Sequence, residues 1–369
     1  MADLYIGLMS GTSLDGVDAV MADFSGPKCR VTHYQSASIA PELRAELLAL
    51  NSPGANELHR AALAANALVR LYAATVQALL AASGTPASAV AALGAHGQTV
   101  RHRPQAFDGT GYTLQLNNPA LLAELTGITV VADFRSRDVA AGGQGAPLVP
   151  AFHQHLFGRK DGCMLVLNIG GISNLSVLRP DGTVLGFDCG PGNALMDHWC
   201  QRHTGQPFDH AGAWAASGVA PPGLLAHMLR EPYLHQAPPK STGRDLFNPA
   251  WLEAQLHAWG AERPQDVQAA LAELTALSGA QAALQYGAES RHLAVCGGGA
   301  RNAHLMRRLQ AALPNMRVQA SDAHGMEAQQ VEAAAFAWLA RQTLRGAPGN
   351  LQSVTGAQGA RVLGAIYPA

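Results

Sequence analysis

Two acidic residues, Asp188 and Glu332, are candidates for acid–base catalysis. In LGFDCGPGNALMD, Asp188 ends a short apolar run and precedes a Gly-Pro-Gly turn and a helical pattern. General-base catalysis needs a carboxylate within hydrogen-bonding reach of the nucleophile's proton. An Asp before Gly is also a common turn former. Glu332 is the only charged residue in VEAAAFAWLA, where it either favours the helix dipole or points into a site.

Three turns rich in small residues have the composition of phosphate-binding loops. They are SGTSLDGVD, IGGISN and CGGGARN, each directly after an apolar run. Backbone N–H groups and hydroxyls in such turns form a concave set of donors for phosphate oxygens, and Gly permits close approach. The alternative for each is a hairpin or packing turn. The candidate phosphate and nucleotide residues are Gly11, Thr12, Ser13, Leu14, Asp15, Gly16, Val17 and Asp18, then Gly170, Gly171, Ser173 and Asn174, then Gly297, Gly298 and Gly299.

The carboxylates of the first turn suggest a metal ion. Asp15 and Asp18 repel phosphate, so they make sense beside it only with a divalent cation between them, directly or through water. Other motifs are missing: there is no G-x-G-x-x-G, no P-loop, no G-x-S-x-G and no defensible zinc spacing.

Two further loops carry polar side chains suited to a sugar. GAHGQTVRHRP supplies Gln98 and Thr99, and VVADFRSRDVAAGGQGAP supplies Asp133 and Arg135. An arginine beside an acidic residue can clamp an anionic group with bidentate bonds. A surface ion-pair loop is the alternative interpretation.

Strands alternating with helices must position these groups, which indicates an α/β chain. Helical patterns occupy residues 193–204, 249–258, 267–287, 302–312 and 328–345. Laid over each other, MSGTSLDGVDAV and IGGISNLSVL place residues 10–13 on residues 170–173, so we expect a duplicated unit. The length of 369 residues also favours two domains.

Composition excludes some function classes. The net charge of −1 without a basic run argues against nucleic-acid binding. The longest apolar stretch, residues 61–83, is interrupted by polar residues and predicts a core helix, not a membrane span. Five cysteines without a C-x-x-C pair, and a start without signal-peptide features, predict a cytoplasmic protein without disulfides.

Seven blocks together resemble the motifs of the anhydro-N-acetylmuramic acid kinase family. They are GLMSGTSLDGVD, AHGQTVRH, DFRSRDVAAGGQGAPLVP, LNIGGISN, GFDCGPGNALMD, GGGARN and VEAAAFAWLA, and the resemblance runs from residue 6 to the terminal LGAIYPA. Cys189 stands where the family pattern leads us to expect Thr.

The resemblance implies a two-lobed, actin-like ATPase (ribonuclease-H-like) α/β fold with a central nucleotide cleft. We expect an N-terminal lobe over residues 1–140 and a C-terminal lobe over residues 141–369. Residues 346–369 either pack back on the N-terminal lobe or stay with the C-terminal one. The implied reaction uses ATP and Mg²⁺ to hydrolyse and phosphorylate 1,6-anhydro-N-acetylmuramic acid, giving N-acetylmuramic acid 6-phosphate in peptidoglycan recycling. The resemblance also suggests a homodimer.

By the same resemblance, Asp188 is the general base for the attacking water and Glu332 is a carboxylate at the sugar. Gln98, Thr99, Asp133 and Arg135 are the expected sugar contacts. Two alternatives stay open: another actin-fold sugar kinase acting on an intact hydroxyl, and a nucleotide-driven interaction protein without a sugar substrate.

Overall fold

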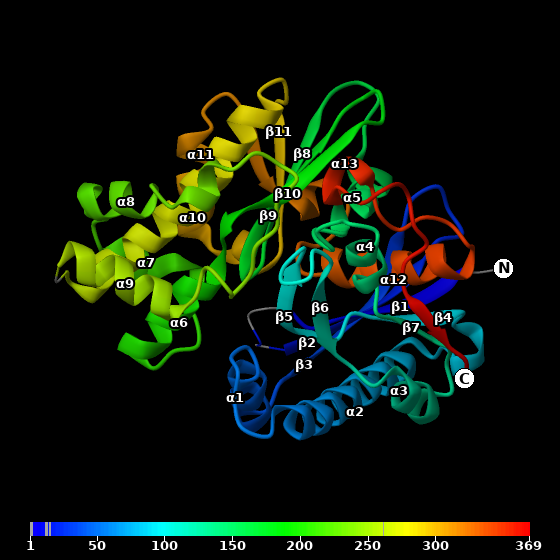
Figure 1. Cartoon of the computed structure of the whole chain (residues 1–369). Coiled ribbons are helices and arrows are strands. Elements are labelled where there is room, and N and C mark those ends of the chain that lie inside the picture. The colour runs from blue at the N-terminus through cyan, green and yellow to red at the C-terminus, as the bar shows by residue number, and fades with distance from the viewer. Residues whose placement is uncertain (1–2, 12–13, 15, 261) are drawn as a thin grey trace. The chain divides into compact units, whose positions relative to one another are not determined.

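The computed structural model describes residues 3–11, 14, 16–260 and 262–369. The chain forms two compact units, Met1–Leu156 with Gln329–Ala369, and Phe157–Ala328. The division falls after Leu156, later than the predicted residue 140, and the first unit takes the whole C-terminal segment. Figure 1 shows both units as mixed sheets with helices.

The first unit is built on a six-stranded sheet of order β13-β7-β4-β1-β2-β3. β1, β2 and β3 form an antiparallel meander, and β4 and β7 extend it in parallel with β1. A separate hairpin, β5–β6, follows β4. The strands are β1 Leu4–Met9, β2 Gly16–Asp23, β3 Arg30–Ser38, β4 Ala92–Ala95, β5 Gln98–Pro104, β6 Gly111–Leu116, β7 Val130–Ala132 and β13 Ala365–Tyr367.

The second unit has a five-stranded sheet of order β10-β9-β8-β11-β12. β8, β9 and β10 again form an antiparallel meander, and β11 and β12 continue in parallel with β8. Five strands therefore repeat in the same order and direction in both units, which confirms the predicted duplicated, ribonuclease-H-like fold class. The strands are β8 Met164–Ile169, β9 Ile172–Leu178, β10 Val184–Pro191, β11 His292–Cys296 and β12 Arg317–Ala320.

The five predicted helical patterns are all helices in the structure, which also has helices that the sequence analysis did not predict. In the first unit they are α1 Pro41–Ala49, α2 Glu57–Ser83, α3 Pro119–Thr126, α4 Ser136–Ala140, α5 Val149–Phe157, α12 Val331–Leu344 and α13 Gln352–Thr355. In the second they are α6 Asn193–Thr204, α7 Ala213–Ser217, α8 Pro222–Met228, α9 Pro249–Trp259, α10 Pro264–Gly287 and α11 Ala303–Ala312. Several begin at an Asn cap; the Asn302 side chain, for example, accepts from the Leu305 N–H at 3.0 Å.

Helix α12 packs against β1, β2 and β4 of the first sheet, although it was predicted for the second lobe. Gly7 of β1 and Gly94 of β4 permit this close approach. A Cβ on Gly7 would lie 2.7 Å from the Ala337 nitrogen, and one on Gly94 would lie 2.7 Å from the Phe336 carbonyl carbon. The apolar sequence of α12 therefore reflects burial on the first unit's sheet.

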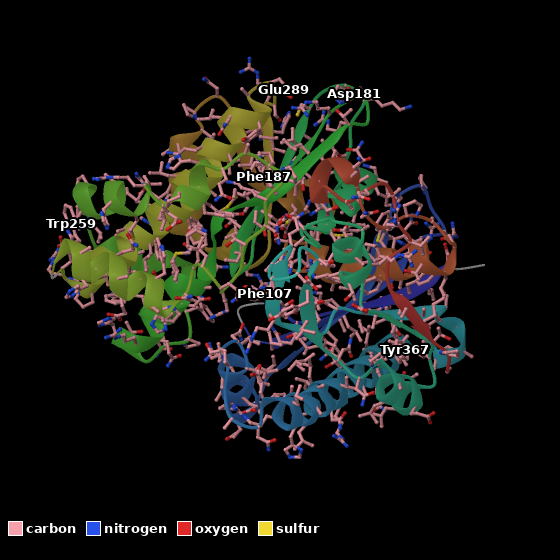
Figure 2. All side chains as sticks on the ribbon, viewed as in Figure 1. Phe107, Asp181, Phe187, Trp259, Glu289 and Tyr367 are labelled. Atoms are coloured by element: carbon pink, nitrogen blue, oxygen red, sulfur yellow. The ribbon has the colours of Figure 1, made fainter. Side chains whose placement is uncertain are left out.

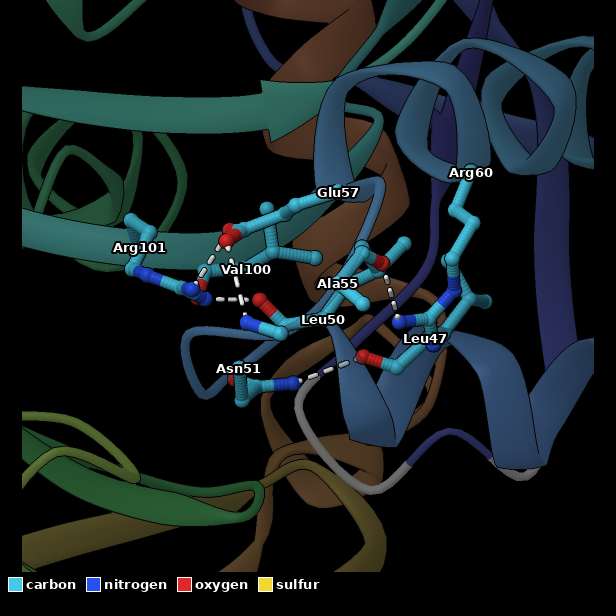
Figure 3. A network of polar contacts seen from close by, with 9 residues as sticks. Leu47, Leu50, Asn51, Ala55, Glu57, Arg60, Val100 and Arg101 are labelled. Atoms are coloured by element: carbon cyan, nitrogen blue, oxygen red, sulfur yellow. Dashed lines mark hydrogen bonds and ion pairs between the residues drawn. The ribbon is translucent and has the colours of Figure 1, made fainter.

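Arg101, which belongs to the predicted sugar-binding stretch GAHGQTVRHRP, is a structural residue. Its side chain comes from β5, donates to the Leu50 carbonyl and forms an ion pair with Glu57 at 2.6 Å (Figure 3). These bonds tie the β5–β6 hairpin to the turn between α1 and α2.

Helix α2 is, within the described ranges, the one helix with the length and hydropathy of a membrane span. Half of the apolar stretch is buried, and α2 packs on β2, β3 and α3, as expected of a core helix. The five cysteines are all buried and free.

Candidate functional site

The first phosphate turn connects β1 to β2. Thr12, Ser13 and Asp15 lie outside the described residues. Gly11 accepts the Leu14 N–H at 3.2 Å, and Leu14 has a left-handed backbone with φ 57°. The side chains of Leu14 and Val17 are buried in the core. These two positions therefore offer only main-chain atoms to a ligand.

Ser10, at the entry of this turn, joins a buried network. Its hydroxyl donates to Gln98 Oε1 at 2.5 Å, and its carbonyl lies 3.3 Å from His96 Nδ1. Arg135 donates to His96 Nε2 at 3.0 Å and to the Gly145 carbonyl at 2.9 Å. The structure thus brings together two predicted sugar-binding residues, Gln98 and Arg135, at the base of the phosphate turn.

His96 acts as a neutral spacer in this network. Burial, and then the positive charge of Arg135, lower the pKa of His96 to about 3. A neutral imidazole has one acceptor and one donor nitrogen. Nε2 then accepts from Arg135 and Nδ1–H donates to Ser10, so the ring sets the direction of the guanidinium.

The two other predicted sugar contacts are held by local bonds. Thr99 Oγ1 accepts from Gln115 at 3.2 Å on the β5–β6 hairpin. Asp133 is exposed, has φ 58°, and accepts the Ser136 hydroxyl at 2.5 Å. Both lie in the first unit with Gln98 and Arg135.

Asp138, which follows Arg135 in the same motif, is a structural carboxylate. It is fully buried and accepts hydrogen bonds from the Gly145 N–H at 2.8 Å, and from Asn350 Nδ2 and Thr355 Oγ1 at 2.7 Å each. It therefore ties the Gly-rich loop to the C-terminal segment.

The carboxylate of Asp18, predicted as a metal ligand, accepts the Tyr34 hydroxyl at 2.6 Å on the neighbouring strand β3. Among the described side chains, no group of three or more His, Cys, Asp or Glu gathers in a metal-binding arrangement. The described residues do not form a preformed metal cage.

Glu332 is half-buried in the first turn of α12. A carboxylate there interacts favourably with the helix dipole. Because α12 packs on β1 and β4, Glu332 belongs to the same unit as the Ser10 network.

Asp188, the predicted base, lies inside β10 in the second unit, and the strand continues to Pro191, where the sequence indicated a Gly-Pro-Gly turn. Its side chain is 6% exposed, and Oδ2 accepts the Thr242 N–H at 3.0 Å. The pairing with β9 shifts between Asp188 and Gly190, which makes Cys189 a bulge residue. Bulges redirect neighbouring side chains and are frequent near active sites.

Asp188 belongs to a row of polar residues that crosses the sheet. It pairs with Asn174 of β9, which pairs with Asn168 of β8. Directly paired residues project from the same face of a sheet. Asn174 Oδ1 is buried without a hydrogen-bond partner, and Asn168 Oδ1 lies 3.5 Å from Cys296 Sγ on β11. The row runs from the predicted base to the strand that leads into the third Gly-rich turn.

The second phosphate turn is short and sits on the start of α6. The Gly170 carbonyl accepts from Asn193 N–H at 2.7 Å, and the Gly171 carbonyl from Gly192 N–H at 3.0 Å. Ser173 is fully buried on β9, and its hydroxyl donates to Pro191 O at 3.1 Å. The carbonyls of this turn are therefore used within the fold, whereas its own N–H groups remain the candidates for a phosphate.

The third turn requires glycine on steric grounds. Gly297 has φ 76°, and its Cβ would lie 2.6 Å from Asn168 Oδ1 and 2.7 Å from the Ile169 carbonyl oxygen. A Cβ on Gly299 would overlap the Ile169 side chain. The turn continues into a short 3-10 helix, Gly298–Arg301, and then into α11. Main chain at such a surface can approach a flat or phosphorylated ligand closely.

Sequence reasoning missed the residues that hold Asp188. They are Tyr233, Lys240 and Thr242, which approach β10 from a segment more than forty residues later. The one available signal was the rarity of lysine: the chain has three, and Lys240 is buried.

Comparison with known proteins identifies relatives along the whole chain. Residues 3–369 match the family model of anhydro-N-acetylmuramic acid kinase. An anhydro-N-acetylmuramic acid kinase of Variovorax paradoxus is 67% identical over 372 residues, covering 100% of this chain and 99% of the relative. One of Albidiferax ferrireducens is 63% identical and covers 100% of both chains. A solved ROK family glucokinase from Streptomyces griseus, in complex with glucose and AMPPNP, aligns with 92% of this chain and 99% of its own at 14% identity, with a TM-score of 0.42.

Proposed function

Because this chain belongs to the anhydro-N-acetylmuramic acid kinase family, we propose that it opens and phosphorylates 1,6-anhydro-N-acetylmuramic acid with Asp188 as general base. It is a phosphotransferase that uses ATP. The product is N-acetylmuramic acid 6-phosphate, and the place of the reaction is peptidoglycan recycling. One observation supports this role of Asp188. Its carboxylate accepts the Thr242 N–H next to a bulge, in the polar row of the second sheet.

The chemistry joins two events. A water oxygen bonds to the anomeric carbon, the bond from that carbon to O6 breaks, and one water proton passes to Asp188. The freed O6 then bonds to the γ-phosphorus, and the bond from that phosphorus to the β,γ-bridging oxygen of ATP breaks, which releases ADP. The proton leaves Asp188 to solvent afterwards. Phosphoryl transfer itself depends mostly on positioning and neutralisation of charge.

The first unit supplies the proposed sugar contacts. Arg135 is aimed by His96, which suits it to pair with the lactyl carboxylate of the substrate. Gln98, Thr99 and Asp133 provide further polar groups, and Glu332 provides a carboxylate at the sugar. If Arg135→Ala left the KM for the sugar unchanged, the pairing with the lactyl group would be refuted.

The Gly-rich turns supply the proposed nucleotide contacts. The turns that start at Gly11 and Gly170 would donate main-chain N–H groups to phosphate, and Gly297 to Gly299 would lie against the nucleotide. Mg²⁺ is commonly held by one or two carboxylates together with substrate phosphates. We therefore expect the ion to arrive with ATP and to contact Asp15 or Asp18, directly or through water.

We also propose a homodimer located in the cytoplasm, on the basis of the family resemblance and the reduced cysteines.

The decisive experiment follows the oxygen atom of water. The protein is incubated with Mg-ATP and the anhydrosugar in ¹⁸O-water, and the sugar product is analysed by mass spectrometry. We expect one phosphate and one labelled water to be added, and we expect Asp188→Asn to abolish this product. An unlabelled phosphate adduct would instead indicate a simple sugar kinase. ADP release with an unchanged sugar would indicate an ATPase without a sugar substrate.

A further inference from the structure

One segment of the second unit wraps around Asp188. The Tyr233 hydroxyl donates to the Asp188 carbonyl at 2.7 Å, and the Asp188 N–H donates to the Lys240 carbonyl at 3.4 Å. The Thr242 N–H donates to the carboxylate at 3.0 Å. Residues 233–242 therefore form hydrogen bonds with the carbonyl, the N–H and the carboxylate of Asp188.

The ammonium of Lys240 connects the end of this segment to its beginning. Lys240 is 6% exposed, and its Nζ donates to the carbonyls of Tyr233 at 2.9 Å and Leu234 at 3.2 Å. The same nitrogen lies 4.6 Å from the ring centre of Tyr233 and 5.6 Å from that of Phe187, the residue before Asp188. Phe187 is labelled in Figure 2. One cation thus joins the beginning and the end of the segment to strand β10.

Burial of the Lys240 cation carries a desolvation cost, so stability alone does not explain why a lysine stands here. Burial lowers the pKa of Lys240, and the neighbouring Cys189 and Asp188 act in the opposite direction. An apolar side chain of similar length would fill the same space without the desolvation cost. The hydrogen bonds of Lys240 go to main-chain carbonyls of the segment that holds Asp188, which points to a role in placing that residue.

We propose that Lys240 is a positioning residue for the general base: it keeps segment 233–242 closed, so that the Thr242 amide and the Tyr233 hydroxyl fix Asp188. This inference rests on the proposed function of Asp188. Lys240 touches no reacting atom in this scheme.

Two other titratable neighbours of Asp188, Cys189 and Tyr233, are neutral. Burial, followed by the charge of Asp188, raises the pKa of Cys189 to about 12 and also raises that of Tyr233. Of these three neighbours Lys240 carries the positive charge, and a nearby cation favours the ionised form of a carboxylate, which a general base requires. Its removal should move the acidic limb of the kcat profile to higher pH.

The test compares Lys240→Met with Lys160→Met, a matched control at an exposed lysine of the same unit. We expect Lys240→Met to lower kcat by about 10- to 100-fold, because small misplacement of a catalytic group has effects of this size. The KM values for sugar and ATP should stay within about twofold of wild type, since Lys240 is not among the proposed contacts of either ligand. Lys160→Met should match wild type in kcat, and Lys240→Arg should recover part of the loss.

A second variant covers the case in which Lys240→Met does not fold. Tyr233→Phe removes one hydroxyl from a ring that stays in place, and we expect kcat to fall about 3- to 10-fold at unchanged KM, in line with the loss of one hydrogen bond. A melting temperature that falls while kcat and its pH profile stay at wild-type values would overturn the positioning role. A wild-type protein that makes no labelled product would instead refute the proposed function, so the two failures are distinguishable.

Discussion

The contact of α12 with β1 offers the sharpest test of how the first unit is built. Gly7 lies under the helix, and an added Cβ would overlap the Ala333 carbonyl oxygen and lie 2.7 Å from the Ala337 nitrogen. All three nearest atoms belong to the helix main chain, which cannot rotate away as a side chain can. In Gly7→Ala the whole helix must therefore retreat until the closest separations reach the ordinary 3.4 Å or more.

Overpacking of a core costs about 1–3 kcal/mol, and the rigid neighbours place Gly7→Ala near about 3 kcal/mol of destabilisation. For a unit of this size, that corresponds to a melting temperature lower by about 6–12 °C. Glu332 lies in the first turn of the displaced helix. A folded variant should therefore also lose about 10-fold or more in kcat.

Differential scanning calorimetry measures the first effect and steady-state kinetics the second. The control is Gly26→Ala in the β2–β3 turn, where the nearest atom to an added Cβ is the Lys28 carbonyl oxygen at 3.7 Å. That variant should stay within about 0.5 kcal/mol of wild type. A Gly7→Ala protein that melts within a degree of wild type would show that α12 does not pack on β1 as described.

Three other variants probe separate features. Gly297→Ala places a Cβ 2.7 Å from a main-chain oxygen at φ 76° and should raise the Kd for ATP at least about 10-fold. Gly325→Ala, at φ 98° in open space, controls for backbone strain, and calorimetric titration with nucleotide measures Kd for both variants. Burial lowers the pKa of His153 to about 3. As the pH falls below 6.5, the His153 ring is therefore protonated only in the unfolded chain, and about 1.4 kcal/mol of folding stability is lost per pH unit. His153→Leu should flatten the decline in urea midpoints between pH 7 and pH 5, and a decline as steep as that of wild type would contradict the buried neutral imidazole. Asp138→Ala leaves three buried donors without their acceptor and should lower the free energy of unfolding in urea by about 3 kcal/mol or more. A decrease under about 1 kcal/mol would contradict the structural role.

Local pattern was sufficient to predict most elements. The pattern over residues 193–204 predicted α6 with both of its ends, and the pattern over residues 302–312 predicted α11 to within one residue. Periodicity carries this information because each helix must bury one face. The same signal does not say which sheet a helix covers. This is why α12 was assigned to the second lobe although it lies on β1 and β4.

The overlay of the two hairpins was right up to the turns and wrong beyond them. β1 ends at Met9 and β8 at Ile169, so Ser10 and Gly170 are equivalent, as predicted. β2, however, begins at Gly16, whereas β9 begins at Ile172, because the first turn is longer. Ser173 is therefore a buried strand residue rather than the counterpart of Ser13, and an ungapped comparison cannot detect the difference.

Contacts between distant segments were beyond prediction from the sequence. The motif AHGQTVRH indicated a polar loop, but not that His96 and Arg135 would bond across β4 and β7, or that Arg101 would be used in the scaffold. The role of Lys240 is still harder to predict, because its segment bonds to Asp188, which stands beside a bulge that depends on the pairing of β9 with β10. Such bonds arise from tertiary structure, and no local periodicity encodes them.

The two candidate carboxylates occupy different positions of the five-strand repeat. In the first unit, Asp18 of β2 pairs with Met9, the last residue of β1. In the second unit, the last residue of β8, Ile169, pairs with Ser173, so Ser173 is the equivalent of Asp18. Asp188 instead lies on the third strand of the repeat, β10, where it pairs with Asn174. The first unit therefore has a carboxylate held by Tyr34 beside the longer phosphate turn, and the second has one next to a bulge, where segment 233–242 can hold it as a base. Differences in turn length and bulge position, within the same strand order, therefore separate the proposed phosphate-binding and base functions of the two halves.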